Sequence, residues 1–327
     1  MLNGCEIGVA LPTRAKGNSK SGMKKNPKCL KLASYNIPSD SQGPFRLSLI
    51  INHIDRLPPN TRPSLGRPAN ESRMTEQTLG NTVAIVSGSN SGIGAAIIRE
   101  LSSRGASTVI NYPFPSLKAE AESLSLSLPT PSICVEADMS TTTGPKSLVD
   151  ATMAAYGRLD IVVNSAGLAI NLPFEEQNLS HWDSLVNLNG RGVFLLTQAA
   201  LPHLTRGRGR IVNIVSLSSR APPPLQTIYA GTKGMVDSFT RCWAKELPPT
   251  YGCTVNAVSP GPTMTEGFKA AGPEAMKVLQ PTIDSTPVGK RMGDPSEIAF
   301  AVGFLCEERA RWVNGEHLMA CGGLHID

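Results

Sequence analysis

One segment of the sequence, residues 87–94, constrains the fold more than any other. It consists of Ser-Gly-Ser-Asn-Ser-Gly-Ile-Gly and lies between a short β-branched run at 82–86 and a helical pattern at 95–104. Glycines permit a tight turn from strand to helix and let the backbone approach a pyrophosphate. The free N–H groups at the start of the helix then bind the anion. This order predicts a dinucleotide site that includes Gly88, Asn90, Ser91, Gly92, Ile93 and Gly94.

Strand and helix patterns alternate along the rest of the chain. Helical patterns separate short apolar runs that predict buried strands at 107–112, 132–139, 159–167, 209–216, 254–261 and 315–323. Such alternation is typical of a parallel sheet with helices on both faces. The sequence therefore predicts a single α/β domain at 79–327, with a Rossmann-type, doubly wound parallel sheet.

Polar and small residues at the strand ends mark the expected ligand crevice, because open α/β sheets bind ligands outside the carboxyl ends of their strands. Asp138 ends the third strand and could reach an adenine amino group, although it could equally cap the helix that follows. Where a ribose must pass, the fourth strand ends in Asn164, Ala166 and Gly167. The nicotinamide end is expected to be lined by Pro260, Gly261, Thr263 and Thr265.

The end of the second strand bears on which dinucleotide binds. An acidic residue there would hydrogen-bond the adenosine ribose 2′-OH and favour NAD. This chain has Asn111-Tyr112 instead, which would not repel a 2′-phosphate, so NADP(H) is favoured over NAD(H). The nearest candidates to contact that phosphate are Asn90, Ser116 and Lys118.

Tyr229 and Lys233 lie four residues apart, on one face of a helix predicted to begin near Gln226. A phenol titrates near pH ~10, and moving its pKa to about 7 takes roughly 4 kcal/mol of preferential stabilisation of the phenolate. A nearby ammonium and the positive ring of an oxidised nicotinamide are suitable sources. Such a pair is common by chance, but Ser216, at the end of the fifth strand, is expected in the same crevice.

Two further segments flank this crevice. A long helical pattern at 181–205 contains Asn189 among apolar residues, where a buried amide needs hydrogen-bond partners. Asn189 is therefore a candidate for a kink or a bound water. Residues 266–289 mix Gly, Pro and apolar side chains and predict a mobile helical lid over a substrate. Pro, Ser and Glu at 295–297 predict the first turn of another helix.

Together these motifs resemble the short-chain dehydrogenase/reductase family over roughly residues 80–327. Residues 87–94 are similar to the family's T-G-x-x-x-G-x-G, with Ser87 for Thr, and residues 164–167 to its N-N-A-G, with Ser165 for Asn. Pro260-Gly261 matches the turn after strand six, whereas Cys321 replaces an Asp that many members carry. The resemblance implies a catalytic tetrad of Asn189, Ser216, Tyr229 and Lys233.

The resemblance also implies a mechanism without a metal. Tyr229 would exchange a proton with the carbonyl oxygen, and Lys233 would lower the tyrosine pKa and bind the nicotinamide ribose. Ser216 would hold the substrate oxygen, and Asn189 would anchor a water. The chain is most similar to fungal ketoreductases and 3-oxoacyl-carrier-protein reductase-like enzymes, which implies a small-molecule ketone of polyketide or other secondary metabolism. Helices at 181–205 and 226–248 resemble those that pair in homodimers and homotetramers of the family.

Charge and cysteine content disfavour other classes. Residues 1–80 hold 12 of the 31 Lys and Arg but 5 of the 26 Asp and Glu, so the remainder gives no reason to expect nucleic-acid binding. The sequence contains no run of 18 apolar residues, so no membrane-spanning helix is predicted. Seven scattered cysteines form no metal-ligand spacing and favour a reducing compartment, the cytoplasm.

The basic extension at 1–78 is rich in Pro, Ser, Asn and Lys and is predicted to be disordered. It could be a mitochondrial targeting peptide, a tail that binds a partner, or the result of a reading frame that begins too early. The last is favoured, because Met74 precedes the first strand. Three functions stay open for the domain: an NADPH-dependent carbonyl reductase, an NAD-linked secondary-alcohol dehydrogenase, and a non-catalytic dinucleotide-binding protein. The complete set of four implied catalytic residues favours an enzyme.

Overall fold

The structure, a computed structural model, describes residues 77–270 and 272–327. The predictions made for the extension, namely disorder, a targeting peptide, a partner-binding tail and an early start, lie outside the described residues.

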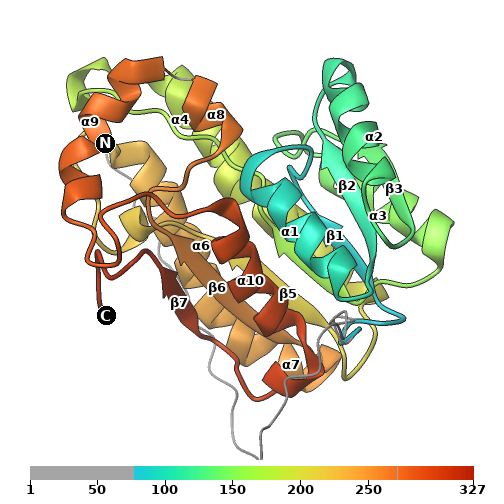
Figure 1. The fold of residues 1–327 in the computed structure, drawn as a ribbon. Coiled ribbons are helices and arrows are strands. Elements are labelled where there is room, and N and C mark those ends of the chain that lie inside the picture. Colours follow the sequence, from blue (N-terminus) through green and yellow to red (C-terminus); the bar gives the residue numbers. More distant parts are fainter. Residues whose placement is uncertain (1–76, 271) are drawn as a thin grey trace, which may run out of the picture. The chain divides into compact units, whose positions relative to one another are not determined.

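Seven parallel strands form one sheet in the order β3-β2-β1-β4-β5-β6-β7 (Figure 1). The order changes direction between β1 and β4, which is the switch point of a doubly wound sheet. The Rossmann-type α/β fold predicted from the sequence is therefore confirmed. The strands are β1 (Val83–Val86), β2 (Ser107–Tyr112), β3 (Ser132–Glu136), β4 (Ile161–Asn164), β5 (Arg210–Ile214), β6 (Thr254–Pro260) and β7 (His317–Ala320).

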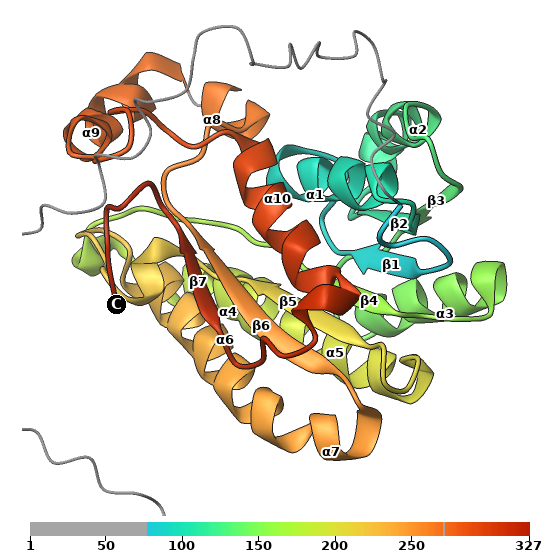
Figure 2. The same ribbon diagram turned by 60° about the horizontal axis from the view of Figure 1, so that its bottom comes forward.

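Helices cover both faces of the sheet, which is why the central strands are apolar along their whole length. One layer contains α1, α2 and α10, and the other contains α3, α5 and α6 (Figure 2). The helices are α1 (Gly92–Ser103), α2 (Lys118–Leu126), α3 (Gly144–Tyr156), α4 (Leu179–Val186), α5 (Val193–Ala200), α6 (Thr227–Glu246), α7 (Pro248–Tyr251), α8 (Glu266–Ala270), α9 (Gly272–Asp284) and α10 (Pro295–Cys306).

The two helical layers enclose two apolar cores. On one side Ile97, Ile98 and Leu101 of α1 pack with Ile298 and other residues of α10. On the other side buried residues of α3, α5 and α6 pack against the opposite face of the strands. The predicted start of α10 is confirmed, because the Asp294 side chain caps the helix and Glu297 returns the hydrogen bond.

Parallel pairing brings the carboxyl ends of the strands to one edge. Val86 of β1 pairs with Val163 of β4, and Ile214 of β5 pairs with Val258 of β6. The segments that follow these strands therefore leave the sheet side by side. The segment predicted as a lid is helical, as α8 and α9, and these helices lie apart from the two helical layers (Figure 2).

The expected helix at 181–205 is not a single α-helix. Between α4 and α5 the chain forms a π-helical segment, η3 (Asn187–Gly192), and a 3₁₀ turn (Leu201–His203) follows α5. The backbone after β3 lies very close to this π-helical segment. A Cβ on Gly192 would lie 2.4 Å from the Met139 carbonyl oxygen. Asn189, for which a kink or a bound water was predicted, lies within this π-helical segment, and the unbroken helix expected at 181–205 is corrected.

Candidate active site

The turn between β1 and α1 has the geometry of a phosphate cradle. Gly88 and Gly92 have positive φ angles of 60° and 57°. A Cβ on Gly94 would lie 2.4 Å from the Gly88 carbonyl oxygen, so only glycine fits there. The Ser91 side chain does not cap α1, which leaves the first N–H groups of the helix for an anion. These residues fit the pyrophosphate of a dinucleotide.

Two of the other predicted cofactor segments lie against this turn. The Ser87 hydroxyl oxygen accepts hydrogen bonds from Ser165 N at 3.0 Å and Ala166 N at 3.1 Å, which ties the turn to the segment after β4. The segment after β6 reaches the turn from another direction. The Thr265 methyl lies 3.6 Å from where a Cβ on Gly92 would be. The three segments therefore border one crevice.

Pro260, Gly261 and Thr263 form the tight turn that directs the chain after β6. Gly261 N donates to the Ala320 carbonyl oxygen at 3.1 Å, and a Cβ on Gly261 would lie 3.0 Å from Cys321. The Thr263 hydroxyl donates to the Gly261 carbonyl oxygen at 2.9 Å. This turn holds the segment that leads to Thr265 beside β7.

Asn111 lies near the end of β2, as the sequence predicted. Its side chain is buried, with Oδ1 accepting from Gly88 N and Nδ2 donating to the Ala137 carbonyl oxygen, both at 2.9 Å. Tyr112 is also buried. Asn111 therefore supports the backbone of the glycine-rich turn, and its amide is not free to contact a 2′-phosphate. An Asn near the carboxyl end of a buried strand needs internal partners, and the turn backbone supplies one.

An acidic residue that sequence reasoning missed lies near the turn. Glu120, in the first turn of α2, accepts a hydrogen bond from the Asn90 side chain at 2.8 Å, and both residues lie near the surface. Lys118 lies 3.7 Å from Glu122 on the same helix. No local signal links Glu120 to Asn90, because thirty residues separate them.

Asp138 and Asn164 are largely occupied by contacts within the protein. Asp138 Oδ1 accepts from the backbone N and the hydroxyl of Ser140, both at 2.8 Å, which closes a local turn. The predicted helix cap at Asp138 is wrong, because the N-cap of α3 is Thr143, five residues later. Asn164 Nδ2 donates to Thr197 Oγ1 at 3.0 Å and Asn213 Oδ1 at 2.8 Å, inside the core. Its side chain thus joins β4 to α5 and β5 rather than entering the crevice.

The predicted proximity of Tyr229 and Lys233 is observed. Lys233 Nζ lies 5.9 Å from the Tyr229 ring centroid and donates to the Ile214 carbonyl oxygen at 2.9 Å. Gly167 is adjacent, since a Cβ there would lie 3.3 Å from Nζ. Lys233 is buried, and this burial lowers its pKa to about 8. The amine is therefore near the point of losing its charge at slightly alkaline pH.

Tyr229 hydrogen-bonds Ser216, which lies two residues beyond the end of β5. Burial raises the pKa of Tyr229 above its usual value, and the hydrogen bond with Ser216 acts in the opposite direction. Lys233 alone therefore does not give the phenol the lowered pKa that the family resemblance implied. The Ser216 hydroxyl oxygen also accepts from Ser218 N at 3.1 Å, at the start of the short helix η5 (Leu217–Ser219).

Asn189 is fully buried in η3 and joins three segments. Its Oδ1 accepts from Leu168 N at 2.9 Å, while its Nδ2 donates to the Leu168 carbonyl oxygen at 2.9 Å and to Thr232 Oγ1 at 3.1 Å. Thr232 directly precedes Lys233 on α6. All four residues of the implied tetrad therefore lie in one continuous cluster at the carboxyl edge of the sheet.

A buried charged cluster supports this arrangement and was not foreseen. Asp237 lies one turn after Lys233 on α6 and pairs with Arg220 at 3.2 Å, Arg241 at 2.8 Å and His317 at 2.7 Å. Arg220 is the C-cap of η5, so the ion pair connects the Ser216 segment to α6. His317 Nε2 also lies 2.7 Å from Ser259 Oγ. This Ser–His–Asp order is no hydrolytic site, because Ser259 is fully buried.

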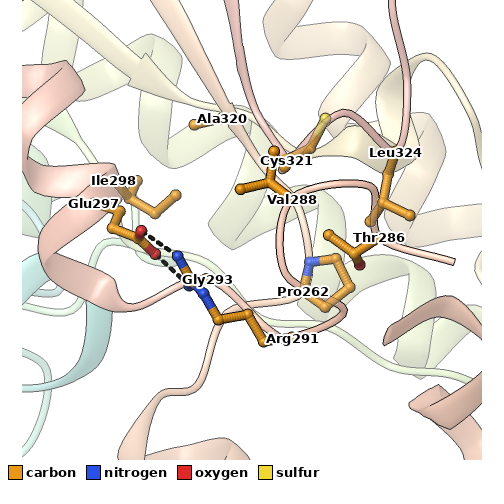
Figure 3. Close-up of a pocket in the computed structure, with 11 residues that line it drawn as sticks. Pro262, Thr286, Val288, Arg291, Gly293, Glu297, Ile298, Ala320, Cys321 and Leu324 are labelled. Atoms are coloured by element: carbon orange, nitrogen blue, oxygen red, sulfur yellow. Dashed lines mark hydrogen bonds and ion pairs between the residues drawn. The ribbon is translucent and has the colours of Figure 1, made fainter. Parts of the chain in front are cut away.

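A cavity of about 200 Å³ lies next to the turn after β6, outside the tetrad cluster (Figure 3). Pro262 and Cys321 line it, and across it Arg291 donates two hydrogen bonds to the Glu297 carboxylate at 2.6 and 2.7 Å. These bonds lower the pKa of Glu297 to about 2. The Cys321 thiol lies 3.5 Å from the His325 carbonyl oxygen, in the C-terminal turn.

The sequence matches a protein-family model described as enoyl-(acyl carrier protein) reductase over residues 88–325. A similar relative is the short-chain dehydrogenase/reductase FrzI of Cladobotryum, with 39% identity over 76% of this chain and 97% of the relative. Another is the hydroxynaphthalene reductase arp2 of Aspergillus fumigatus, with 33% identity over 73% of this chain and 90% of the relative.

Solved structures agree with the sequence matches. One is a blue fluorescent protein from a metagenomic library in complex with NADPH, with a TM-score of 0.71 and 31% identity. The match covers 76% of this chain and all of that chain. Among the helices that the structure describes, none is long and apolar enough to cross a membrane. The chain belongs to the short-chain dehydrogenase/reductase family and is an NAD(P)-dependent oxidoreductase.

Proposed function

We propose that this protein is an NADPH-dependent ketone reductase whose catalytic domain comprises residues 79–327. The observation that carries the proposal is the clustering of Ser216, Tyr229 and Lys233 beside the glycine-rich turn. A proton donor and a hydroxyl group that can hold an oxygen thus lie at the edge of the sheet where a dinucleotide binds.

In this proposal Ser216 and Tyr229 together hold the carbonyl oxygen of the substrate. Tyr229 donates its proton to that oxygen during reduction and accepts one during oxidation. Lys233 holds the nicotinamide ribose, and its charge favours the phenolate that is left after proton transfer. Asn189 fixes the segment after β4 against α6, and it anchors a water near Lys233. The bound nicotinamide supplies or accepts the hydride.

The preference for NADPH over NADH is supported by two features. No acidic residue ends β2, and a structural relative was solved in complex with NADPH. One observation favours an NAD-linked secondary-alcohol dehydrogenase as the second candidate. The Glu120 carboxylate lies 2.8 Å from the Asn90 amide, and a carboxylate near the adenosine ribose would oppose a 2′-phosphate.

The substrate is proposed to be a small-molecule ketone of fungal secondary metabolism. The relative named hydroxynaphthalene reductase supports this class. We also propose that the protein forms homodimers or homotetramers through α4, α5 and α6, within 181–205 and 226–248. Leu179 and Trp182 are exposed on α4, beside a groove of about 620 Å³ between α4 and the start of α6.

The test is NADPH oxidation by the purified protein with a panel of ketones, together with dissociation constants for NADPH and NADH. Turnover with ketones and tighter binding of NADPH are expected. A protein that binds NADPH but reduces no ketone would contradict the reductase. Tighter binding of NADH would favour the second candidate. Tyr229→Phe is the matched control, since it removes one hydroxyl and should abolish turnover while leaving NADPH binding intact.

A further inference from the structure

Leu225 has a backbone conformation that leucine rarely adopts. Its φ is 73°, in the left-handed region where a Cβ crowds the following carbonyl and glycine is the usual residue. Conformations of this kind persist only where the surrounding structure enforces them, and they are enriched at functional sites.

Hydrogen bonds around Leu225 hold its backbone in place. Its carbonyl oxygen accepts from Leu172 N at 3.0 Å. Gln177 joins the same two segments, because its Nε2 donates to the Leu172 carbonyl oxygen at 2.9 Å and its Oε1 accepts from Ile228 N at 3.3 Å. The segment after β4 and the segment before α6 are thus held together, four residues ahead of Tyr229.

The Leu225 side chain belongs to neither of the two apolar cores. It is 42% exposed, and the preceding residues 221–224 are exposed as well. Leu168, on the segment that Asn189 holds, is 43% exposed. Leu225 is also absent from the lining of the groove between α4 and α6, although the nearby Thr227 and Ile228 line it. The proposed subunit interface therefore does not explain it.

The stretches nearest to the contact at Leu225 carry no charge, and the nearest charged residues in the sequence are Glu175 and Arg220. Residues 168–174 and 221–228 contain no Asp, Glu, Lys or Arg. The first segment leads from β4 towards α4, and the second leads from η5, which follows Ser216, into the start of α6, which carries Tyr229. A substrate bound against these joined segments meets uncharged side chains, which stabilise an apolar body and leave a charged group without a partner.

We propose that Leu225 is a specificity-determining residue that contacts the apolar body of the substrate while Ser216 and Tyr229 hold its carbonyl oxygen. The inference rests on the proposed function and specifies its substrate class as bulky, uncharged, apolar ketones. A glycine at position 225 would relax the backbone. A leucine at this position keeps the backbone strained but provides a side chain for the substrate to contact.

The test compares Leu225→Gly with the unaltered protein on a bulky apolar ketone and on a small ketone such as a short-chain aliphatic one. We expect KM for the bulky ketone to rise about tenfold, the scale of burying one leucine side chain. The small ketone and the NADPH dissociation constant should change less than about twofold. The thermal midpoint should stay equal or rise, because glycine relieves the positive φ.

Two further variants and one control complete the experiment. Leu225→Ala keeps the backbone strain and should raise KM for the bulky ketone similarly, whereas Leu225→Met should restore it. Asn81→Gly is the control, because Asn81 has a φ of 60° but precedes β1, at the opposite edge of the sheet. It should leave both ketones unaffected.

An unchanged KM for the bulky ketone in both Leu225→Gly and Leu225→Ala would overturn the inference, whatever the stability of the variants. A fall in the thermal midpoint of Leu225→Gly with unchanged KM would assign Leu225 a packing role instead. If the unaltered protein reduces neither ketone, the proposed function itself fails, and that outcome is visible before any variant is made.

Discussion

Lys233→Met removes a buried amine from the candidate active site, and its effect on stability can be worked out from the structure. Burial lowers the pKa of Lys233 from 10.5 to about 8, so the unfolded chain binds more protons between these two values. The free energy of unfolding therefore rises with pH from about 8 to about 10.5. At pH 7 the buried charge costs the folded state about 3 kcal/mol, and at pH 10 about 1 kcal/mol.

Methionine has a similar length and no charge, but it cannot donate to the Ile214 carbonyl oxygen. That loss costs about 1–2 kcal/mol. We therefore expect the free energy of unfolding of Lys233→Met to exceed that of the unaltered protein by about 1–2 kcal/mol at pH 7. This advantage should disappear or reverse near pH 10, because Lys233 is then neutral in the folded state.

Urea unfolding at pH 7, 8.5 and 10 measures the free energy of unfolding of the variant and of the unaltered protein. Lys245→Met is the matched control, because Lys245 is an exposed lysine on the same helix, and its effect should stay within about 0.5 kcal/mol at every pH. Destabilisation of Lys233→Met at pH 7 by the same amount as at pH 10 would refute the reasoning, since a desolvated ammonium must make the difference depend on pH.

Three other substitutions test separate parts of the site. Tyr229→Phe should lower kcat by about 10²–10⁴-fold with little change in NADPH affinity, as measured by steady-state kinetics and cofactor titration. Gly94→Ala should weaken NADPH binding and lower the thermal midpoint, because the new Cβ would lie 2.4 Å from the Gly88 carbonyl oxygen; unchanged binding would exclude the proposed cradle. Asp237→Ala should lower the free energy of unfolding by about 3–5 kcal/mol, since it removes the buried carboxylate that pairs with His317 and leaves Arg220 only the more distant Asp327, and a loss below about 1 kcal/mol in urea unfolding would contradict this.

The features predictable from sequence were those that local pattern determines. The central strands were predictable because helices cover both faces of the sheet. Each of these strands is therefore a continuous run of apolar residues that can be recognised in the sequence. Tyr229 and Lys233 are close because they lie one turn apart on α6, a relation that needs no tertiary information. The glycine-rich turn was predictable for the same reason, since Gly88 and Gly92 have positive φ angles that other residues rarely adopt.

The features that escaped prediction depend on contacts between distant segments. The role of Asn111 required knowing that the Gly88 N–H lies within 2.9 Å of its side chain. Glu120 meets Asn90 only because α2 packs beside the turn. Asp237 and His317 come together from α6 and β7, eighty residues apart. Side-chain direction and long-range charge pairing follow from the assembled sheet and cannot be derived from periodicity.

The π-helical segment at Asn187–Gly192 has a consequence for how this region tolerates insertions and deletions. A π-turn accommodates one residue more than an α-turn, so it rotates everything after it by about 100° around the helix axis. Leu196 and Ala200 are buried in α5 in that rotated register. Deleting a single residue here would restore a regular helix, turn these side chains out of the core and move Asn189 away from Leu168 at once. We therefore expect that insertions and deletions are not tolerated within this segment and are tolerated in the loop that precedes α4.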